Sequence, residues 1–202
     1  MINKNLLFDR LLRVLPNFLW LLKREIIKFL IKQKGNNLII SSDSVILEFS
    51  NITIGDNVFI NRNFYCSAIM GVLIGDRVMF GANISIIGGN HKFNNYEESL
   101  RFPSQLGDNQ KIIIESDAWI GHGTTILKGA MIGEGTIVGA ASLVNKILLP
   151  YSVYAGNPIR FIKPRFNTEE ELMLHLTFLN KKYSFTTKYC RAELSIIYEK
   201  NK

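Results

Sequence analysis

Six aliphatic residues recur at intervals of six along the second half of the chain. They are Ile114, Ile120, Ile126, Ile132, Val138 and Val144. An amphipathic helix repeats its apolar positions about every 3.6 residues, and a half-buried strand about every two. A period of six over this length fits neither element. It predicts a coil of short flat segments, each of which directs one aliphatic side chain inward before a turn.

The positions around these aliphatic residues favour the same coil. The fourth residue after each of the first five is small: Ala118, Thr124, Ala130, Thr136 and Ser142. Three of the six aliphatic residues are followed directly by a glycine: Gly121, Gly133 and Gly139. We expect the small residues to let stacked coils approach. We expect the glycines to adopt corner backbone angles that other residues disfavour.

The same period occurs upstream in two shorter runs. These runs are Ile54, Ile60 and Cys66, and then Ile74, Phe80 and Ile86. The step of eight from Cys66 to Ile74 predicts a bulge of two extra residues. The step from Ile86 to Ile114 is not a multiple of six, so a loop excursion is expected at about residues 88–111. The predicted fold is all-β, a parallel β-helix over 37–163, with an amphipathic helical N-terminal segment (1–36) and a C-terminal helix and tail (164–202).

The positive charge of the chain is concentrated at its N-terminus. The formal net charge is +7, and residues 1–34 contain eight basic and two acidic side chains. A nucleic-acid surface would need basic residues along the coil, so no nucleic-acid partner is expected. Cys66 falls at an inward position of the repeat, and two cysteines do not make a disulfide framework. A reducing, cytoplasmic location is therefore expected.

The N-terminal segment has the period of an amphipathic helix that Pro16 kinks or divides. Its apolar positions are Leu11, Leu15, Phe18, Leu22, Ile26 and Phe29, and its basic positions are Arg10, Arg13, Arg24, Lys28 and Lys32. No uncharged run reaches the roughly 18 residues that span a bilayer. Two interpretations remain open. The apolar face packs on the end of the coil, or it lies on an anionic membrane at the inner face.

Of the three histidines, His91 is the candidate for chemistry. It ends the segment Gly88-Gly-Asn-His91, where the repeat stops and the excursion begins, and polar residues on loops of a rigid scaffold often carry function. Imidazole can accept and return a proton near neutral pH. The alternative is a loop histidine with no role. His175 falls in a predicted helix over 168–180 that opens at Thr168, and is expected to be structural or exposed.

Several motifs together resemble the hexapeptide-repeat acyltransferases, in the branch of sugar and xenobiotic O-acetyltransferases. Besides residues 88–91, they are Trp119-Ile-Gly-His-Gly, Ile132-Gly-Glu-Gly-Thr-Ile-Val-Gly-Ala, Lys146 and Ala155-Gly-Asn-Pro-Ile-Arg. The resemblance covers about residues 50–166 and implies that the β-helix is left-handed. It also implies that His91 is the general base for direct attack of a substrate hydroxyl on acetyl-CoA, and that Asn61 binds the acceptor. The alternative for Asn61 is a corner residue in a left-handed turn.

The resemblance further implies a coenzyme A groove between two subunits of a homotrimer. Trp119 would flank the pantetheine arm, with Ala140 and Asn145 as neighbouring contacts. Lys146, Arg160 and Lys163 would bind the phosphates, or would be solvated surface charges. His122 stands where relatives carry a small residue, so it could touch the pantetheine, lie at the subunit seam or be neutral. The carboxylate partner of His91 stays open among Glu97, Glu98 and Asp108.

The leading hypothesis is therefore an acetyl-CoA-dependent O-acetyltransferase that uses no metal and acts on a sugar hydroxyl in surface polysaccharide or glycolipid biosynthesis. Two roles stay open for the aromatic residues of the excursion: they stack on a sugar acceptor, or they only hold the loop against a neighbouring subunit. N-acetylation of a nucleotide-linked amino sugar and a non-catalytic β-helix scaffold are the alternatives. A zinc enzyme of the γ-carbonic-anhydrase type would need three histidine ligands, and only His91 and His122 lie in the coil region.

Overall fold

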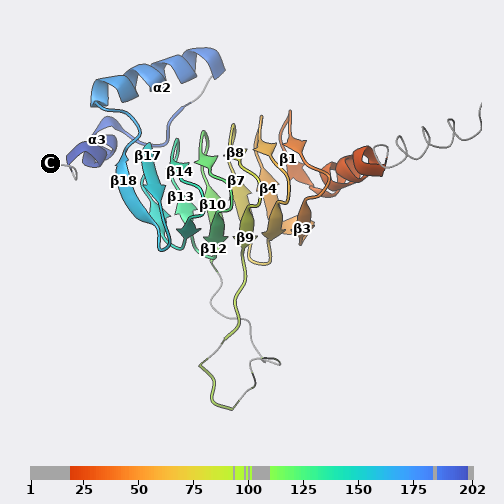
Figure 1. The fold of residues 1–202 in the computed structure, drawn as a ribbon. Helices are drawn as coiled ribbons and strands as arrows, with labels where there is room; N and C mark the ends of the chain where they lie inside the picture. Colours follow the sequence, from red (N-terminus) through yellow and green to blue (C-terminus); the bar gives the residue numbers. More distant parts are fainter. Residues whose placement is uncertain are drawn as a thin grey trace, which may run out of the picture.

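The computed structural model describes residues 19–92, 94–97, 99, 101, 110–183 and 186–199. Their strands form three flat parallel sheets that wrap into one coil, with helices at its two ends (Figure 1). The chain visits the sheets in the repeating order A, B, C, so each coil adds one strand to every sheet. This is the left-handed parallel β-helix that the six-residue period and the resemblance predicted.

The strands are short because each side of the coil is one six-residue repeat. Sheet A contains β1 (Gln33–Lys34), β4 (Ile52–Ile54), β7 (Val72–Ile74), β10 (Ile112–Ile114), β13 (Met131–Ile132) and β16 (Ile147–Leu148). Sheet B contains β2 (Ile39–Ile40), β5 (Phe59–Ile60), β8 (Met79–Phe80), β11 (Trp119–Ile120), β14 (Ile137–Val138), β17 (Ser152–Ala155) and the antiparallel β18 (Arg160–Pro164). Sheet C contains β3 (Val45–Leu47), β6 (Tyr65–Ser67), β9 (Ser85–Ile87), β12 (Thr125–Leu127) and β15 (Leu143–Val144).

The core of the coil consists of the residues that the period identified. All six aliphatic residues of the main run are at most 1% exposed, and the corresponding residues of the two upstream runs are also buried. The residues four positions later are buried as well, from Ala118 to Ser142. Each repeat therefore sends two side chains inward. The register across the strands keeps equivalent residues stacked, as for Ile60, Phe80 and Ile120.

The corner glycines work differently from the expectation. Left-handed backbone angles fall at the third residue after the inward aliphatic, and not at Gly121, Gly133 or Gly139. The left-handed residues include Asn57, Asn63, Arg77, Asn83, Asp117, Gly123, Gly129, Gly135 and Ala141. Gly121, Gly133 and Gly139 are instead needed for close approach, because a Cβ there would lie 2.6–2.8 Å from atoms of the next coil.

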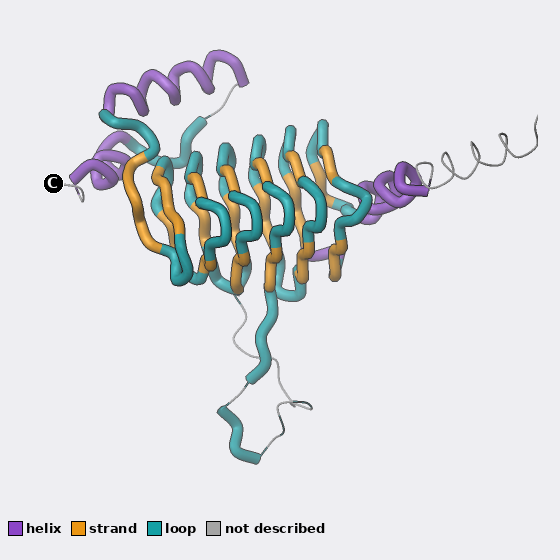
Figure 2. The backbone as a smooth tube through the Cα atoms, in the orientation of Figure 1, coloured by secondary structure: helices purple, strands orange, loops and turns teal. Residues whose placement is uncertain are grey.

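The excursion lies between β9 and β10, and its described part after β9 projects away from the coil (Figures 1 and 2). The described residues of 88–111 contain no helix and no strand element. The predicted bulge is also present. It consists of Ile69 and Met70, between β6 and β7.

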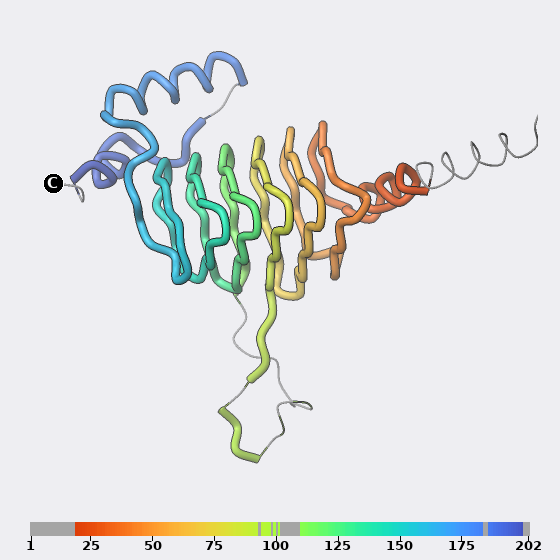
Figure 3. Tube along the Cα trace, viewed as in Figure 1, coloured from red at the N-terminus to blue at the C-terminus, as the bar shows by residue number. Residues whose placement is uncertain are grey.

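The N-terminal helix covers one end of the coil with a face that the sequence analysis did not select (Figure 3). Its described part, residues 19–30, buries Ile27, and Ile31 just after it, in the core of the first coil. The expected apolar face instead stays accessible, with Leu22 48% and Phe29 82% exposed. Pro16 and the expected positions before residue 19 lie outside the described residues. No described helix is long and apolar enough to cross a membrane.

Two helices follow the last strand, α2 (Glu169–Tyr183) and α3 (Arg191–Glu199). Thr168 Oγ1 accepts a hydrogen bond from Glu171 N at 3.3 Å, as the predicted helix start requires. His175 in α2 lies 3.4 Å from Asp117, and Arg77 of the preceding coil lies over the Tyr183 ring. The α2 helix therefore runs along the edge between sheets A and B. Among the described residues that follow α2 there is no strand, and α3 is the one further helix.

Candidate functional site

The first part of the candidate site is a pocket where the excursion leaves sheet C, which we call the His91 pocket. Gly88 N donates to Ser67 O at 2.9 Å, so the excursion begins flat against the preceding coil. A Cβ at Gly88 would overlap that carbonyl oxygen, and a Cβ at Gly89 would lie 3.2 Å from Ile69 Cδ1. The two glycines before Asn90 and His91 are thus explained by close packing at the base of the excursion.

The His91 pocket has a volume of about 290 Å³. It is lined by Tyr65, Ser67, Ile69, Met70, Ile87, Gly89, Asn90 and His91. Sequence reasoning did not assign Tyr65, Ser67, Ile69 or Met70 to the site. A signal was available for the last two, because the eight-residue step from Cys66 to Ile74 marks the insertion that forms this wall.

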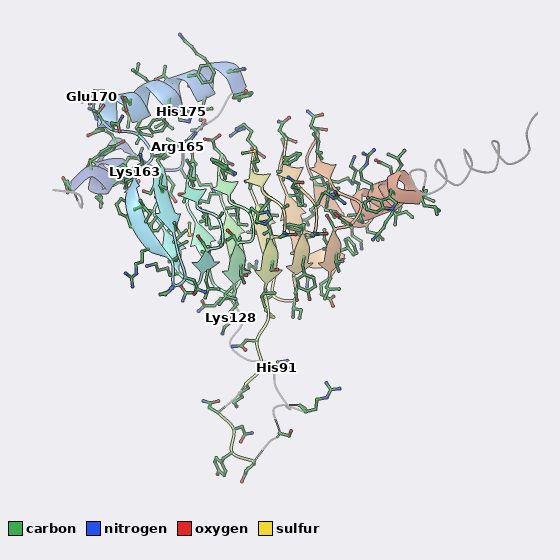
Figure 4. All side chains as sticks on the ribbon, viewed as in Figure 1. His91, Lys128, Lys163, Arg165, Glu170 and His175 are labelled. Atoms are coloured by element: carbon green, nitrogen blue, oxygen red, sulfur yellow. The ribbon has the colours of Figure 1, made fainter. Side chains whose placement is uncertain are left out.

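His91 is exposed at the mouth of this pocket, and its backbone N–H donates to Asn90 Oδ1 at 2.9 Å. Figure 4 shows it on the excursion, clear of the coil. Within the described residues no carboxylate pairs with its imidazole. Of the candidate orienting residues, Glu98 and Asp108 lie outside the described residues. Glu97 is described and exposed.

A second group of candidates lies along the edge between sheets B and C, and consists of Asn61, His122, Ala140 and Arg160. Asn61 directly follows β5, and Arg160 pairs with Ala155 at the end of β17. Asn61 is not in a left-handed turn, because the residue with positive φ at this corner is Asn63 (φ 55°). Its Oδ1 accepts a hydrogen bond from Arg62 N at 2.8 Å. The alternative of a left-handed corner asparagine is therefore wrong.

His122 ends a ladder of amide side chains on this edge. Asn63 Nδ2 donates to Asn83 Oδ1 at 2.9 Å, and Asn83 Nδ2 lies 3.2 Å from His122 Nε2. If Asn83 donates this bond, the neutral ring carries its proton on Nδ1. His122 is exposed, and its backbone carbonyl accepts a hydrogen bond from Ala141 N of the next coil at 2.8 Å.

The remaining candidates lie in two other places. Asn145 and Lys146 are exposed on the edge between sheets C and A, two coils beyond the start of the excursion. Lys146 also lines a pocket of about 420 Å³ at the C-terminal end of the coil. Trp119 and Lys163 belong to one outward row of sheet B, with Trp119 47% exposed.

The structure thus divides the candidates between the two edges that border sheet C, with Trp119 and Lys163 on the adjoining sheet B. His91, Asn145 and Lys146 belong to one edge, and Asn61, His122, Ala140 and Arg160 to the other. Each side of the coil is one six-residue repeat. At about 3.3 Å per residue, ~20 Å of extended chain therefore runs from one edge of sheet C to the other. One protomer therefore does not bring Asn61 to His91. Within the described residues, no cluster of three or more His, Cys, Asp or Glu side chains could hold a metal ion.

Comparison with known proteins agrees with this architecture. A family model described as bacterial transferase hexapeptide (six repeats) matches residues 111–146. The chain is 38% identical over 133 residues to a probable macrolide acetyltransferase from Lysinibacillus sphaericus, a match that covers 63% of this chain and 71% of the relative. It is 32% identical over 146 residues to the galactoside O-acetyltransferase of Escherichia coli K12, covering 70% and 68%. The crystal structure of a maltose O-acetyltransferase from Clostridium difficile 630 superposes with a TM-score of 0.56 at 30% identity, covering 69% of this chain and 73% of that one.

The match to the family model covers the part of the coil that carries Trp119, His122, Ala140, Asn145 and Lys146. The chain belongs to the hexapeptide-repeat acyltransferase family, and it is an acyltransferase.

Proposed function

We propose that the protein transfers an acetyl group from acetyl-CoA to a hydroxyl of a sugar, with His91 as general base. The observation that carries this proposal is the position of His91, which lies at the mouth of a pocket walled by β6, the insertion and the base of the excursion. The acceptor would occupy this pocket. Two relatives with similar folds or sequences are named as galactoside and maltose O-acetyltransferases.

In this mechanism the acceptor hydroxyl gives its proton to the His91 imidazole as its oxygen attacks the thioester carbonyl. The C–S bond then breaks, and the imidazolium returns the proton to the CoA thiolate. The products are an O-acetyl sugar and free CoA thiol, with no acyl-enzyme. General-base assistance of this kind is worth ~10²–10⁴-fold in rate.

We further propose that the active site lies between subunits of a homotrimer. The two groups of candidate residues border sheet C from opposite edges. A ring of three copies could place the Asn61 edge of one protomer against the His91 edge of the next. A site that uses both residues would then be complete only in the assembly.

The groove between such subunits would hold acetyl-CoA. Trp119 would flank the pantetheine arm, with His122 and Ala140 beside it on the same edge. Asn145 would contact the pantetheine arm from the other edge of sheet C. Lys146, Arg160 and Lys163 would supply the cations that phosphates require.

The acceptor would belong to surface polysaccharide or glycolipid synthesis, with the N-terminal helix on the inner membrane face. The support is the accessible apolar stripe of Leu22, Ile26 and Phe29 beside Arg24 and Lys28. Flotation with anionic vesicles would test this idea. Binding should fall for Ile26→Ser/Phe29→Ser and for the Arg10, Arg13, Arg24 and Lys28 charge-removal variant. If the wild type does not bind the vesicles, the proposed membrane contact is refuted, whereas the proposed acetyl transfer is unaffected.

The enzymatic proposal is tested by thiol release from acetyl-CoA with sugars, nucleotide-linked amino sugars and a macrolide as acceptors. Sugar-dependent release with an O-acetyl product is expected. Release with only the macrolide, or an N-acetyl product, would overturn the proposed acceptor class.

A further inference from the structure

The insertion of Ile69 and Met70 separates two pockets. The His91 pocket lies on one side. On the other side, against the outer face of sheet A, is a groove of about 390 Å³ that we call the sheet A groove. Both residues of the insertion line both pockets. The side chains that define the groove further are Gln33, Ser50, Asn51, Thr53, Leu73 and Lys111.

The floor of the sheet A groove is one outward row across three neighbouring strands. Gln33 of β1 pairs in register with Thr53 of β4, which pairs with Leu73 of β7. Three strands span ~10 Å at about 4.8 Å per step. The wall is held from both sides, because Asn51 Nδ2 donates to Ile69 O at 3.1 Å and Gly89 lies against the Ile69 side chain.

The chemistry of this floor suits a ligand rich in hydroxyl groups. Thr53 Oγ1 donates to Gln33 Oε1 at 2.7 Å, which leaves the Gln33 amide hydrogens and the Thr53 oxygen lone pairs for a ligand. Lys111 packs its methylenes near Gly71, with Cγ 3.3 Å from where a Gly71 Cβ would lie. The described lining residues include no carboxylate. Amide and hydroxyl side chains beside apolar ones form a site that can distinguish the positions of hydroxyl groups around a sugar ring.

We propose that the sheet A groove is a second acceptor subsite, which binds the sugar unit next to the one in the His91 pocket. This inference rests on the proposed function, because it assumes that a sugar occupies the His91 pocket. The insertion of Ile69 and Met70, which separates the two pockets, would lie under the glycosidic linkage between the two sugar units. The enzyme would therefore prefer acceptors of two or more sugar units over the corresponding monosaccharide.

Binding without turnover gives the most direct test. Fluorescently labelled full-length His91→Ala protein would be applied to an array that carries monosaccharides and the oligosaccharides that end in them, and affinities of the hits would be measured by calorimetry. At least one oligosaccharide should bind more tightly than its terminal monosaccharide. The variants Thr53→Val and Gln33→Leu, each combined with His91→Ala, should weaken oligosaccharide binding about fivefold to tenfold. This is the effect expected when one hydrogen bond to the ligand is lost. Monosaccharide binding should stay within about twofold.

Thr177→Val on α2 is the matched control, since it removes an exposed hydroxyl far along the chain from the groove. No preference for any oligosaccharide, or equal losses for monosaccharide and oligosaccharide, would overturn the subsite. If selective oligosaccharide binding is found but the wild type acetylates no sugar, the proposed function fails while the groove stands. If sugars are acetylated with no gain from a second unit, the function stands and the subsite fails.

Discussion

Asn61 and His91 lie at opposite edges of sheet C in one protomer. Asn61 follows β5 on the edge shared with sheet B, whereas His91 leaves the coil after β9 on the edge shared with sheet A. The His91 pocket accordingly does not include Asn61. The α2 helix lies along the third edge, between sheets A and B. The candidate residues lie on the two edges beside sheet C, except Trp119 and Lys163, which lie on the outer face of sheet B.

This separation predicts complementation between inactive subunits. Asn61→Ala and His91→Ala proteins should each be nearly inactive. After random mixing into trimers, about a quarter of the sites should combine an intact Asn61 with an intact His91 from the neighbour. Mixed samples should therefore recover about that share of wild-type acetyl transfer.

The control for this experiment mixes His91→Ala with the double variant Asn61→Ala/His91→Ala, which should stay inactive. Light scattering checks that all samples have the same oligomeric state. If mixing restores nothing although mixed trimers form, the site does not draw these two residues from different subunits.

A second prediction concerns the base of the excursion. Gly88→Ala would force a Cβ into the Ser67 carbonyl oxygen, so the excursion would have to leave the coil along another path. We expect a loss of ~1–3 kcal/mol in unfolding free energy and a strong fall in acetyl transfer. Gly89→Ala is the matched comparison, because its Cβ would meet only the end of Ile69 at 3.2 Å. Thermal melts and kcat/KM should rank Gly88→Ala as the more damaging change, and the reverse order would contradict the packing account.

A third prediction concerns the attachment of α2. Asp117 Oδ2 lies 2.8 Å from Arg165 Nη1 and 3.4 Å from His175 Nε2. Burial acts to raise the pKa of Asp117, but the hydrogen bonds from His175 and Arg165 outweigh burial, so the pKa is lowered. Asn tolerates the left-handed angle at this position (φ 61°), so Asp117→Asn removes the charge without backbone strain. We expect a loss of about 1–3 kcal/mol near neutral pH.

The pH dependence of this loss has a definite sign. A carboxyl whose pKa is lowered on folding stabilises the fold above its unfolded pKa of about 3.9 and stops doing so as pH falls through the folded pKa. The difference in unfolding free energy between wild type and Asp117→Asn should therefore narrow below about pH 4. Glu48→Gln, at an exposed left-handed corner (φ 60°), is the control and should change little. If the difference in unfolding free energy between wild type and Asp117→Asn stays constant below about pH 4, the ion pair does not stabilise the fold.

The core of the fold could be predicted closely from the sequence because the period of six is a local property. The six aliphatic residues of the main run, the first of which is Ile114 and the last Val144, are buried as expected because every repeat has the same geometry. The corner glycines were interpreted less well. Whether Gly121 serves a positive φ or a close approach depends on the position of Ala140 in the next coil, which sequence spacing does not give.

The candidate site was predictable only where a short motif carries it. His91 stands in such a motif, but the pocket beside it depends on Tyr65 and Ile69 of the preceding coil. The N-terminal helix shows a related limit. Its periodicity selected Leu22, Ile26 and Phe29, while the coil end packs against Ile27 and Ile31. A helix with apolar residues on several faces does not reveal which face will meet the core.

The most direct test of the central claim is acceptor-dependent release of thiol from acetyl-CoA, compared between wild type and His91→Ala. Thermal melts would verify that the variant is folded. The account predicts release with a sugar acceptor in the wild type and a fall of ~10²-fold or more in His91→Ala, the lower range for a lost general base. Release that survives in the folded variant would contradict the assignment of His91 as the base.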